Sequence, residues 1–166
     1  NLKTVNLPAS TSVSGHMFAN CTSLSEKFTI GKGVTTLSKY NPFANSAVPG
    51  FIVDENNENF YTDGYGLYSK DGIHSFATGA NISEYEILSK VTINGVEYTV
   101  NSIYNQAFIG ANIDKLTIPS SITFIGEHIA SGSTIGTLYY NATEAGSSGY
   151  WENQYLATPF EKIHAI

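Results

Sequence analysis

The stretch "IDKLTIPSSITFIGEHIA", residues 113–130, joins a short strand signal directly to a turn and a second apolar segment. Its first six residues end in the apolar–polar alternation typical of a β-strand. Pro119 then ends or edges that strand, because proline has no N–H group to donate to a β-ladder. Since Ile122 and Ile125 follow at once, the sequence leaves no helix to cover the strand.

The same apolar template recurs along the chain. It has an apolar residue, two further residues, a second apolar residue, one residue and a third apolar residue. Its first positions are Leu2, Leu24 (with one extra residue), Val48, Leu88, Ile113, Ile135 and Phe160. The intervals between them are 22, 24, 40, 25, 22 and 25 residues. Five of the six fall within the roughly 20–29 residues of a leucine-rich repeat, and the long one predicts an insertion.

A second half-motif follows several of these segments. An aliphatic residue precedes, by five or six positions, an aromatic or small residue, as in "VSGHMF", "LSKYNPF", "IYNQAF" and "IGEHIA". The spacing predicts a second extended piece and a tight turn in each repeat. Because one repeat cannot bury its apolar side alone, neighbouring coils stack and share a continuous core. Each strand is therefore expected to be covered by the next coil.

Hairpin signals mark the long interval. Asp63-Gly64 and Asp71-Gly72 lie between tyrosine-rich, β-prone segments, and Asn94-Gly95 lies within "KVTINGVEYTV". Such dipeptides between strand-like runs predict β-hairpins. We therefore expect a mainly β chain with little helix. It should form one leucine-rich-repeat solenoid of short parallel strands over residues 1–166, with a β-hairpin insertion at about 55–87.

Composition limits the functional classes. The chain has 166 residues, only 13% charged, and a net charge of −6, which argues against nucleic acid as a partner. No run of 18 apolar residues occurs, so we expect no membrane insertion by this segment. The lone Cys21 can form no internal disulfide and is expected to pack as a small apolar residue.

The segments "LTIPSSITFIGEHIA", "VNSIYNQAF" and "MFANCTSL" resemble the repeats of BspA-like leucine-rich-repeat proteins. The insertion "VDENNENFYTDGYGLYSKDG" is also similar to a segment common in that family. Two departures are Ala130 in place of the usual Phe, and Gly31-Lys32-Gly33 in place of the Ile-Pro turn. The resemblance implies a secreted or surface-anchored bacterial protein, often longer than this chain. It also implies adhesion to a surface protein or glycan of a host or neighbouring cell.

Neither catalytic nor metal-binding or cofactor-binding residues are predicted. The chain contains no G-x-S-x-G, P-loop or G-x-G-x-x-G motif. Its four histidines are far apart, whereas a zinc site normally needs three or four converging ligands. "DENNE", residues 54–58, lacks the frame of a calcium loop and is interpreted as a solvated turn. Pairing of Glu26, Glu97 or Glu127 for glycoside hydrolysis cannot be judged from sequence.

The strand register instead predicts a partner-binding face. When the template residues point inward, the residues between them point outward and form one face of a continuous sheet, as in binding solenoids. The predicted contacts are Thr4, Asn6, Lys27, Thr29, Ile52, Lys115, Thr117, Thr137 and Tyr139. Tyr61 and Tyr65 of the insertion, beside Phe60 and Tyr68, are a second candidate. The alternatives are a solvated face on a spacer without a ligand, and a fragment of a glycan-processing enzyme.

Overall fold

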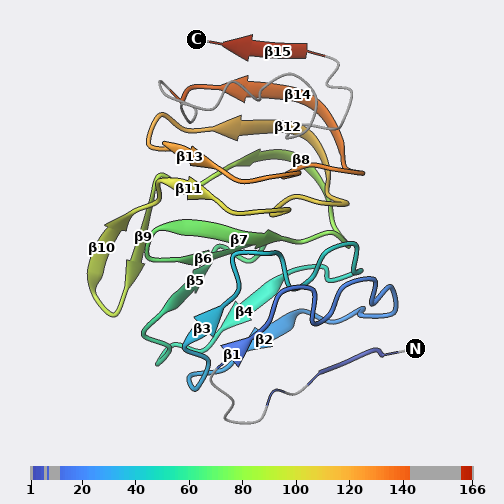
Figure 1. Ribbon diagram of the computed structural model, residues 1–166, viewed down its shortest axis with the longest axis vertical. Coiled ribbons are helices and arrows are strands. Elements are labelled where there is room, and N and C mark those ends of the chain that lie inside the picture. Colours follow the sequence, from blue (N-terminus) through green and yellow to red (C-terminus); the bar gives the residue numbers. More distant parts are fainter. Residues whose placement is uncertain (1, 6, 8–11, 143–161, 166) are drawn as a thin grey trace.

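The computed structural model of the chain is a stack of β-strands (Figure 1). It describes residues 2–5, 7, 12–142 and 162–165, and for the last range only the backbone. Within these residues there is no helix, and hence none long and apolar enough to cross a membrane. The prediction of a mainly β repeat fold is confirmed.

One column of strands is parallel and carries the repeated apolar template. Its members are β2 (Phe28–Ile30), β4 (Phe51–Val53), β8 (Asn81–Glu86), β12 (Asn112–Ile118), β14 (Thr134–Tyr140) and β15 (Lys162–Ala165). These strands form two sheets, β2–β4 and β8–β12–β14–β15, with every neighbouring pair parallel. The prediction of one continuous sheet is therefore wrong.

A second column of short strands corresponds to the second half-motif. Its members are β1 (Ser12–Val13), β3 (Thr36–Leu37), β7 (Gly72–Phe76), β11 (Ser102–Ile103) and β13 (Phe124–Ile125). β1 pairs in parallel with β3, and β11 lies in parallel between β7 and β13. The aliphatic residues of the half-motif, Val13, Leu37, Ile103 and Ile125, all lie in these strands. This confirms the expected second extended piece.

Tight turns follow individual strands of the second column, and the turns of neighbouring coils hydrogen-bond to one another. His16, Gln106 and His128 occupy equivalent positions and all have a positive φ, between 51° and 62°. The N–H of Phe108 donates to the carbonyl of Ile129 at 2.7 Å, one coil further along. Stacked turns therefore satisfy their backbone groups through the neighbouring coil, as stacked strands do.

Three antiparallel hairpins interrupt the stack. β5 (Phe60–Thr62) pairs with β6 (Gly66–Ser69), and β6 pairs in turn with β7. β9 (Lys90–Ile93) pairs with β10 (Val96–Thr99), and this hairpin projects to one side (Figure 1). Asn94 and Gly95 between them have φ values of 51° and 75°, as a type I′ turn requires. All three hairpins predicted from Asp-Gly and Asn-Gly are confirmed.

The predicted strand at residues 88–93 needs correction. Leu88, Val91 and Ile93 match the template, yet residues 90–93 belong to the β9–β10 hairpin. The stacked strand is β8, whose Ile82 and Tyr85 align with Ile113 and Leu116 of β12. The predicted insertion at 55–87 also includes β7 and β8, which belong to the stacked columns, so the antiparallel insertion is shorter.

The buried apolar residues form two clusters. The larger cluster surrounds β7, β8, β11, β12 and β14 and includes Phe76, Phe108, Ile113 and Leu116. The smaller cluster lies under β1–β4 and is rich in phenylalanine, with Phe43 stacked against Phe18 at a centroid distance of 5.5 Å. Cys21 packs at the edge of this cluster. The division between the clusters coincides with the break between the two parallel sheets.

Candidate functional site

The turn between β5 and β6 causes the break in the parallel column. The N–H of Phe51 in β4 donates to the carbonyl of Gly64 at 3.0 Å, so the turn occupies the edge of β4. On the other side, the hydroxyl of Tyr85 in β8 donates to Asp63 at 2.8 Å. Because the turn bonds both strands, it separates the outer face of β2–β4 from that of β8–β12–β14.

Three strands beyond the break present an ordered outer face. The register aligns three rows across β8, β12 and β14. The residues of what we call the β8–β12–β14 face are Asn81, Asn112, Thr134, Glu84, Lys115, Thr137, Glu86, Thr117 and Tyr139. All are exposed or half-buried, whereas Ile113, Leu116 and Ile118 between them are buried. From Lys115 to Ile118 this alternation follows from side chains pointing to opposite sides of a strand, whereas Asp114 and Lys115 are two consecutive residues that are not buried.

Side chains on this face contact one another across the strands. The amide of Asn112 donates to the side-chain oxygen of Asn81 at 2.7 Å. The ammonium group of Lys115 lies 3.5 Å from a carboxylate oxygen of Glu84 and 4.8 Å from the ring centroid of Tyr139. One lysine therefore contacts an acidic side chain on one side and an aromatic side chain on the other, which limits the conformations that all three sample.

The structure brings only some of the predicted binding residues together. Lys115, Thr117, Thr137 and Tyr139 lie on the β8–β12–β14 face. Lys27, Thr29 and Ile52 are exposed on or beside the separate β2–β4 sheet, where Ile52 is 48% exposed. Thr4 is exposed outside any strand, and Asn6 lies outside the described residues.

The tyrosines of the insertion do not form one surface. Tyr68 is fully buried, and its hydroxyl lies 2.5 Å from that of Tyr85. Burial raises the pKa of both phenols, so both stay protonated at neutral pH. Tyr61 packs partly against the larger core cluster, and only Tyr65, 40% exposed, faces solvent to a large extent.

Sequence reasoning missed Asn81, Glu84 and Glu86 on the β8–β12–β14 face. The segment "ISEYEI", residues 82–87, does fit the apolar template, with Tyr85 in the place that Leu116 takes in β12. The neighbouring segment "LSKVTI" fits it equally well with aliphatic residues. The template alone therefore gave no reason to prefer the correct strand.

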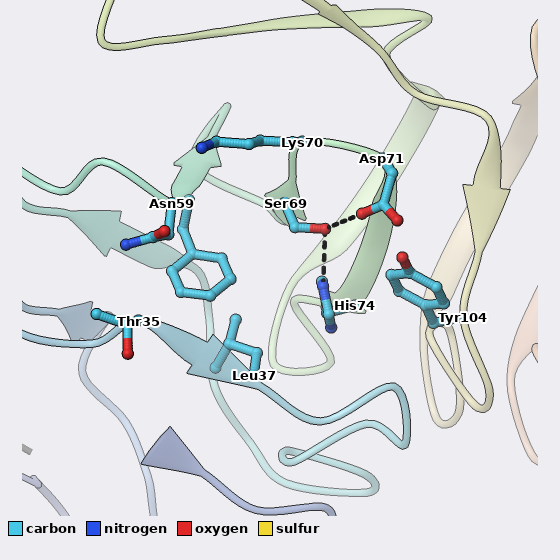
Figure 2. Close-up of a pocket in the computed structure, with 9 residues that line it drawn as sticks. Thr35, Leu37, Asn59, Ser69, Lys70, Asp71, His74 and Tyr104 are labelled. Carbon is cyan, nitrogen blue, oxygen red and sulfur yellow. Dashed lines mark hydrogen bonds between the residues drawn. The ribbon is translucent and has the colours of Figure 1, made fainter. Parts of the chain in front are cut away.

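A polar pocket, also missed, lies between β3, the β5–β6–β7 hairpins and the end of β11 (Figure 2). Its volume is about 250 Å³. The hydroxyl of Ser69 lies 2.9 Å from Asp71 and 2.9 Å from Nε2 of His74. Nδ1 of His74 lies 2.8 Å from the carbonyl of Ser38, so this nitrogen carries a proton and donates.

Burial and hydrogen bonding shift the pKa values in this pocket. Burial lowers the pKa of His74 to about 4, so the imidazole is neutral at pH 7. Burial opposes ionisation of Asp71, but hydrogen bonds from Tyr104 and Ser69 outweigh it and lower the pKa of the carboxyl group. Burial, and then the hydrogen bond to Asp71, raise the pKa of Tyr104. The pocket thus holds a carboxylate, a neutral imidazole and a protonated phenol.

The pocket has the residue types of a serine hydrolase in a different arrangement. In a catalytic triad the carboxylate hydrogen-bonds the histidine, whereas here Asp71 bonds Ser69 and a backbone carbonyl orients His74. A histidine with a pKa of about 4 is also a weak base for activating a hydroxyl at neutral pH. The geometry therefore gives no support to acyl transfer. Among the described residues, no three His, Cys, Asp or Glu side chains converge as a metal site would need.

Comparison with protein families identifies the repeat. The model of the BspA type leucine rich repeat region matches residues 1–137 in six copies. The chain therefore belongs to the BspA-type leucine-rich-repeat family, as its sequence resemblance implied. A comparison with curated proteins finds no match.

Two solved structures are similar to this chain. The pneumococcal vaccine antigen PcpA is 17% identical, with a TM-score of 0.56 over 93% of this chain and 48% of its own. A leucine-rich repeat protein from Eubacterium ventriosum is 19% identical, with a TM-score of 0.49 over 78% of this chain and 45% of its own. The chain thus spans about half the length of these structures. At such low identity, the likeness to PcpA establishes the fold alone.

Proposed function

We propose that this chain is a binding module of a bacterial cell-surface protein, and that it adheres to a protein partner through the β8–β12–β14 face. The observation that carries the proposal is the ordered set of side chains across three parallel strands without an interrupting turn. Repeat proteins commonly use such extended surfaces for recognition. The BspA-type repeat supports a surface location.

The chemistry of the face favours a protein partner. It combines acidic Glu84 and Glu86, basic Lys115, neutral amides and hydroxyls, and the aromatic ring of Tyr139. Tyr139 is the kind of aromatic residue that anchors protein interfaces, and the charged and polar side chains around it match the polar rim of such interfaces. Binding then requires no bond to be made or broken, and the module needs no catalytic group.

The test is a biolayer-interferometry screen of the purified chain against extracellular-matrix proteins. Each positive signal is repeated with Thr117→Glu/Tyr139→Glu, which places two further negative charges on the face. We expect saturable binding to a matrix protein and a loss of at least tenfold in the double variant. The matched control is Thr29→Glu/Ile52→Glu on the β2–β4 sheet, which should bind like the parent chain.

Circular dichroism of both variants checks that the fold persists. If the parent chain binds none of the proteins in the panel, adhesion is rejected and the alternative of a spacer without a ligand is favoured. Equal loss of binding in both double variants would place the contact elsewhere.

A further inference from the structure

The polar pocket continues into a longer groove. A second hollow, of about 500 Å³, lies beside it and is lined by Lys32, Gly33, Thr35, Asn56, Glu58 and Asn59. Thr35 and Asn59 line both hollows. The two hollows therefore adjoin at Thr35 and Asn59 and form one groove between the turn before β3 and the insertion, with His74 and Tyr104 lining the smaller hollow only.

Hydrogen bonds from a single buried side chain fix the wall of this groove. The amide of Asn57, which is 5% exposed, donates to the carbonyls of Gly31 and Val34 at 2.8 and 3.0 Å. Its side-chain oxygen accepts from the N–H groups of Asn59 and Phe60. The insertion is thus held against the second coil, and the groove exists before any ligand arrives. Preformed sites bind with a smaller loss of conformational entropy.

Counting protons shows that the pocket has a surplus of acceptors. Nδ1 of neutral His74 donates to Ser38, so Nε2 can only accept. The hydroxyl of Ser69 has one proton but lies within hydrogen-bond distance of three acceptors: Nε2 of His74, the carboxylate of Asp71 and, at 3.4 Å, the carbonyl of Gly72. At least one of His74 and Asp71 is therefore always left without that proton. A ligand that donates hydrogen bonds to the Asp71 carboxylate would free the Ser69 proton for His74.

The charges around the pocket favour a neutral donor. Lys39 lies 4.9 Å from the ring centroid of Tyr104, close enough to interact electrostatically with Asp71. Lys70 extends away from the Ser69–Asp71–His74 cluster and lies 5.4 Å from the ring centroid of Tyr98 (Figure 2). Lys39 opposes an ammonium ligand beside Asp71, while the carboxylate of Asp71 opposes an anion. The matching ligand carries many hydroxyl groups and no charge.

We propose that the pocket binds a neutral pyranose sugar, with the groove taking the sugars linked to it. Sugar hydroxyls donate to Asp71, and the amide of Asn59, which makes no hydrogen bond within the described part of the chain, donates to a sugar oxygen. Phe60 and Leu37 also line the pocket and supply its apolar side. This site is separate from the β8–β12–β14 face, so one chain would carry a protein-binding and a glycan-binding surface.

Saturation-transfer-difference NMR with the full 166-residue chain tests the proposal. The probes are the methyl pyranosides of glucose, galactose, mannose and N-acetylglucosamine, with the methyl pyranoside of glucuronate, which keeps a free carboxylate, as a charged comparison. Single sugars should bind with a Kd on the order of 1 mM. Asn59→Ala and Asp71→Asn should each weaken binding about tenfold or more, because each removes a hydrogen bond to the sugar. Thr29→Ala, a control on the β2–β4 sheet and outside both proposed sites, should leave it unchanged.

Three results would overturn the proposal: no saturation transfer from any neutral pyranoside, transfer that both pocket variants leave intact, or a preference for the glucuronate. Asn59→Ala keeps the test decisive if Asp71→Asn fails to fold. The side-chain amide of Asn59 supports no other part of the described chain. Since these variants do not touch the β8–β12–β14 face, their outcome is independent of the adhesion screen.

Discussion

The two parallel sheets of one column differ in what holds them together. In β8–β12–β14, each coil buries aliphatic residues such as Ile113 and Leu116 against the next, and strand pairs with strand. At the edge of β4 the parallel strand pairing stops, and hydrogen bonds of polar side chains hold the structure instead. The side chain of Asn57 donates to the carbonyl of Val34, Asp63 accepts from the N–H of Gly66, and the hydroxyl of Tyr85 donates to Asp63. Regular coils are thus stabilised by repeated apolar burial, and the insertion by a few specific hydrogen bonds.

The difference shows how a repeat protein can gain new surface. Repeated apolar burial extends a sheet evenly and produces a flat face. An insertion held by specific hydrogen bonds interrupts the sheet and leaves hollows beside it. The face and the groove therefore arise from the two kinds of stabilisation. The four predictions below test that contrast, in order of decreasing effect.

The largest effect is expected in the regular core. Phe108 is fully buried and stacks on Phe76 at a centroid distance of 5.2 Å. Phe108→Ala should lower the free energy of unfolding by about 3–5 kcal/mol in urea titrations, because it leaves a cavity. Phe124→Ala, at a position 50% exposed, is the matched control and should change it by less than about 0.5 kcal/mol. Similar values for both would show that the stacked coils do not share a packed core.

Acid should lower the free energy of unfolding through His74, which lies in the pocket between the two regions. The folded state lowers the pKa of His74 from its ordinary 6.5 to about 4, so the unfolded chain binds this proton more readily. Stability should therefore fall as pH falls from about 6.5 to about 4, by about 3 kcal/mol in total. Thermal unfolding across this range should show the slope, and His74→Gln should remove it. Persistence of the slope in His74→Gln would assign it to another group.

A smaller effect is expected at the anchor of the insertion. Asn57→Ala leaves the carbonyls of Gly31 and Val34 without their donor and should cost about 2 kcal/mol. Amide hydrogen exchange should accelerate in β5 and β6 more than in β12. Asn56→Ala is the control, since Asn56 is exposed and bonds only Asp54 within the described chain. Equally faster amide exchange in all strands would contradict the view that Asn57 stabilises the insertion locally.

The smallest effect on stability is expected on the β8–β12–β14 face. Lys115 and Glu84 form an exposed ion pair, with side chains 38% and 71% accessible. Lys115→Ala should change the free energy of unfolding by less than about 0.5 kcal/mol, because solvent screens such pairs. A double-mutant cycle with Glu84→Ala measures the coupling. A coupling free energy above about 1 kcal/mol would contradict this expectation, because the ion pair would then contribute to the stability of the strand pairing.

Much of the fold could be predicted because the repeat produces local sequence patterns. The apolar template located β2, β4, β12, β14 and β15, and Asp-Gly and Asn-Gly marked the hairpins, since both signals depend on neighbouring residues. The template also marked residues 2–7, but none of the described residues there belongs to a strand. The break between the sheets could not be predicted, because it depends on where the Gly64 carbonyl meets the edge of β4. The polar pocket was missed for the same reason: His74 meets the carbonyl of Ser38, 36 positions away in sequence.

Hydroxyl-radical footprinting tests the central claim, that the uninterrupted sheet binds the partner and the interrupted one does not. The chain is labelled alone and with the matrix protein that gives the strongest saturable signal in the screen. The account predicts that Tyr139 loses labelling on binding, while Ile52 and Tyr65, 48% and 40% exposed, keep theirs. Protection of Ile52 or Tyr65 with Tyr139 unchanged would contradict it and move the binding surface to the interrupted half.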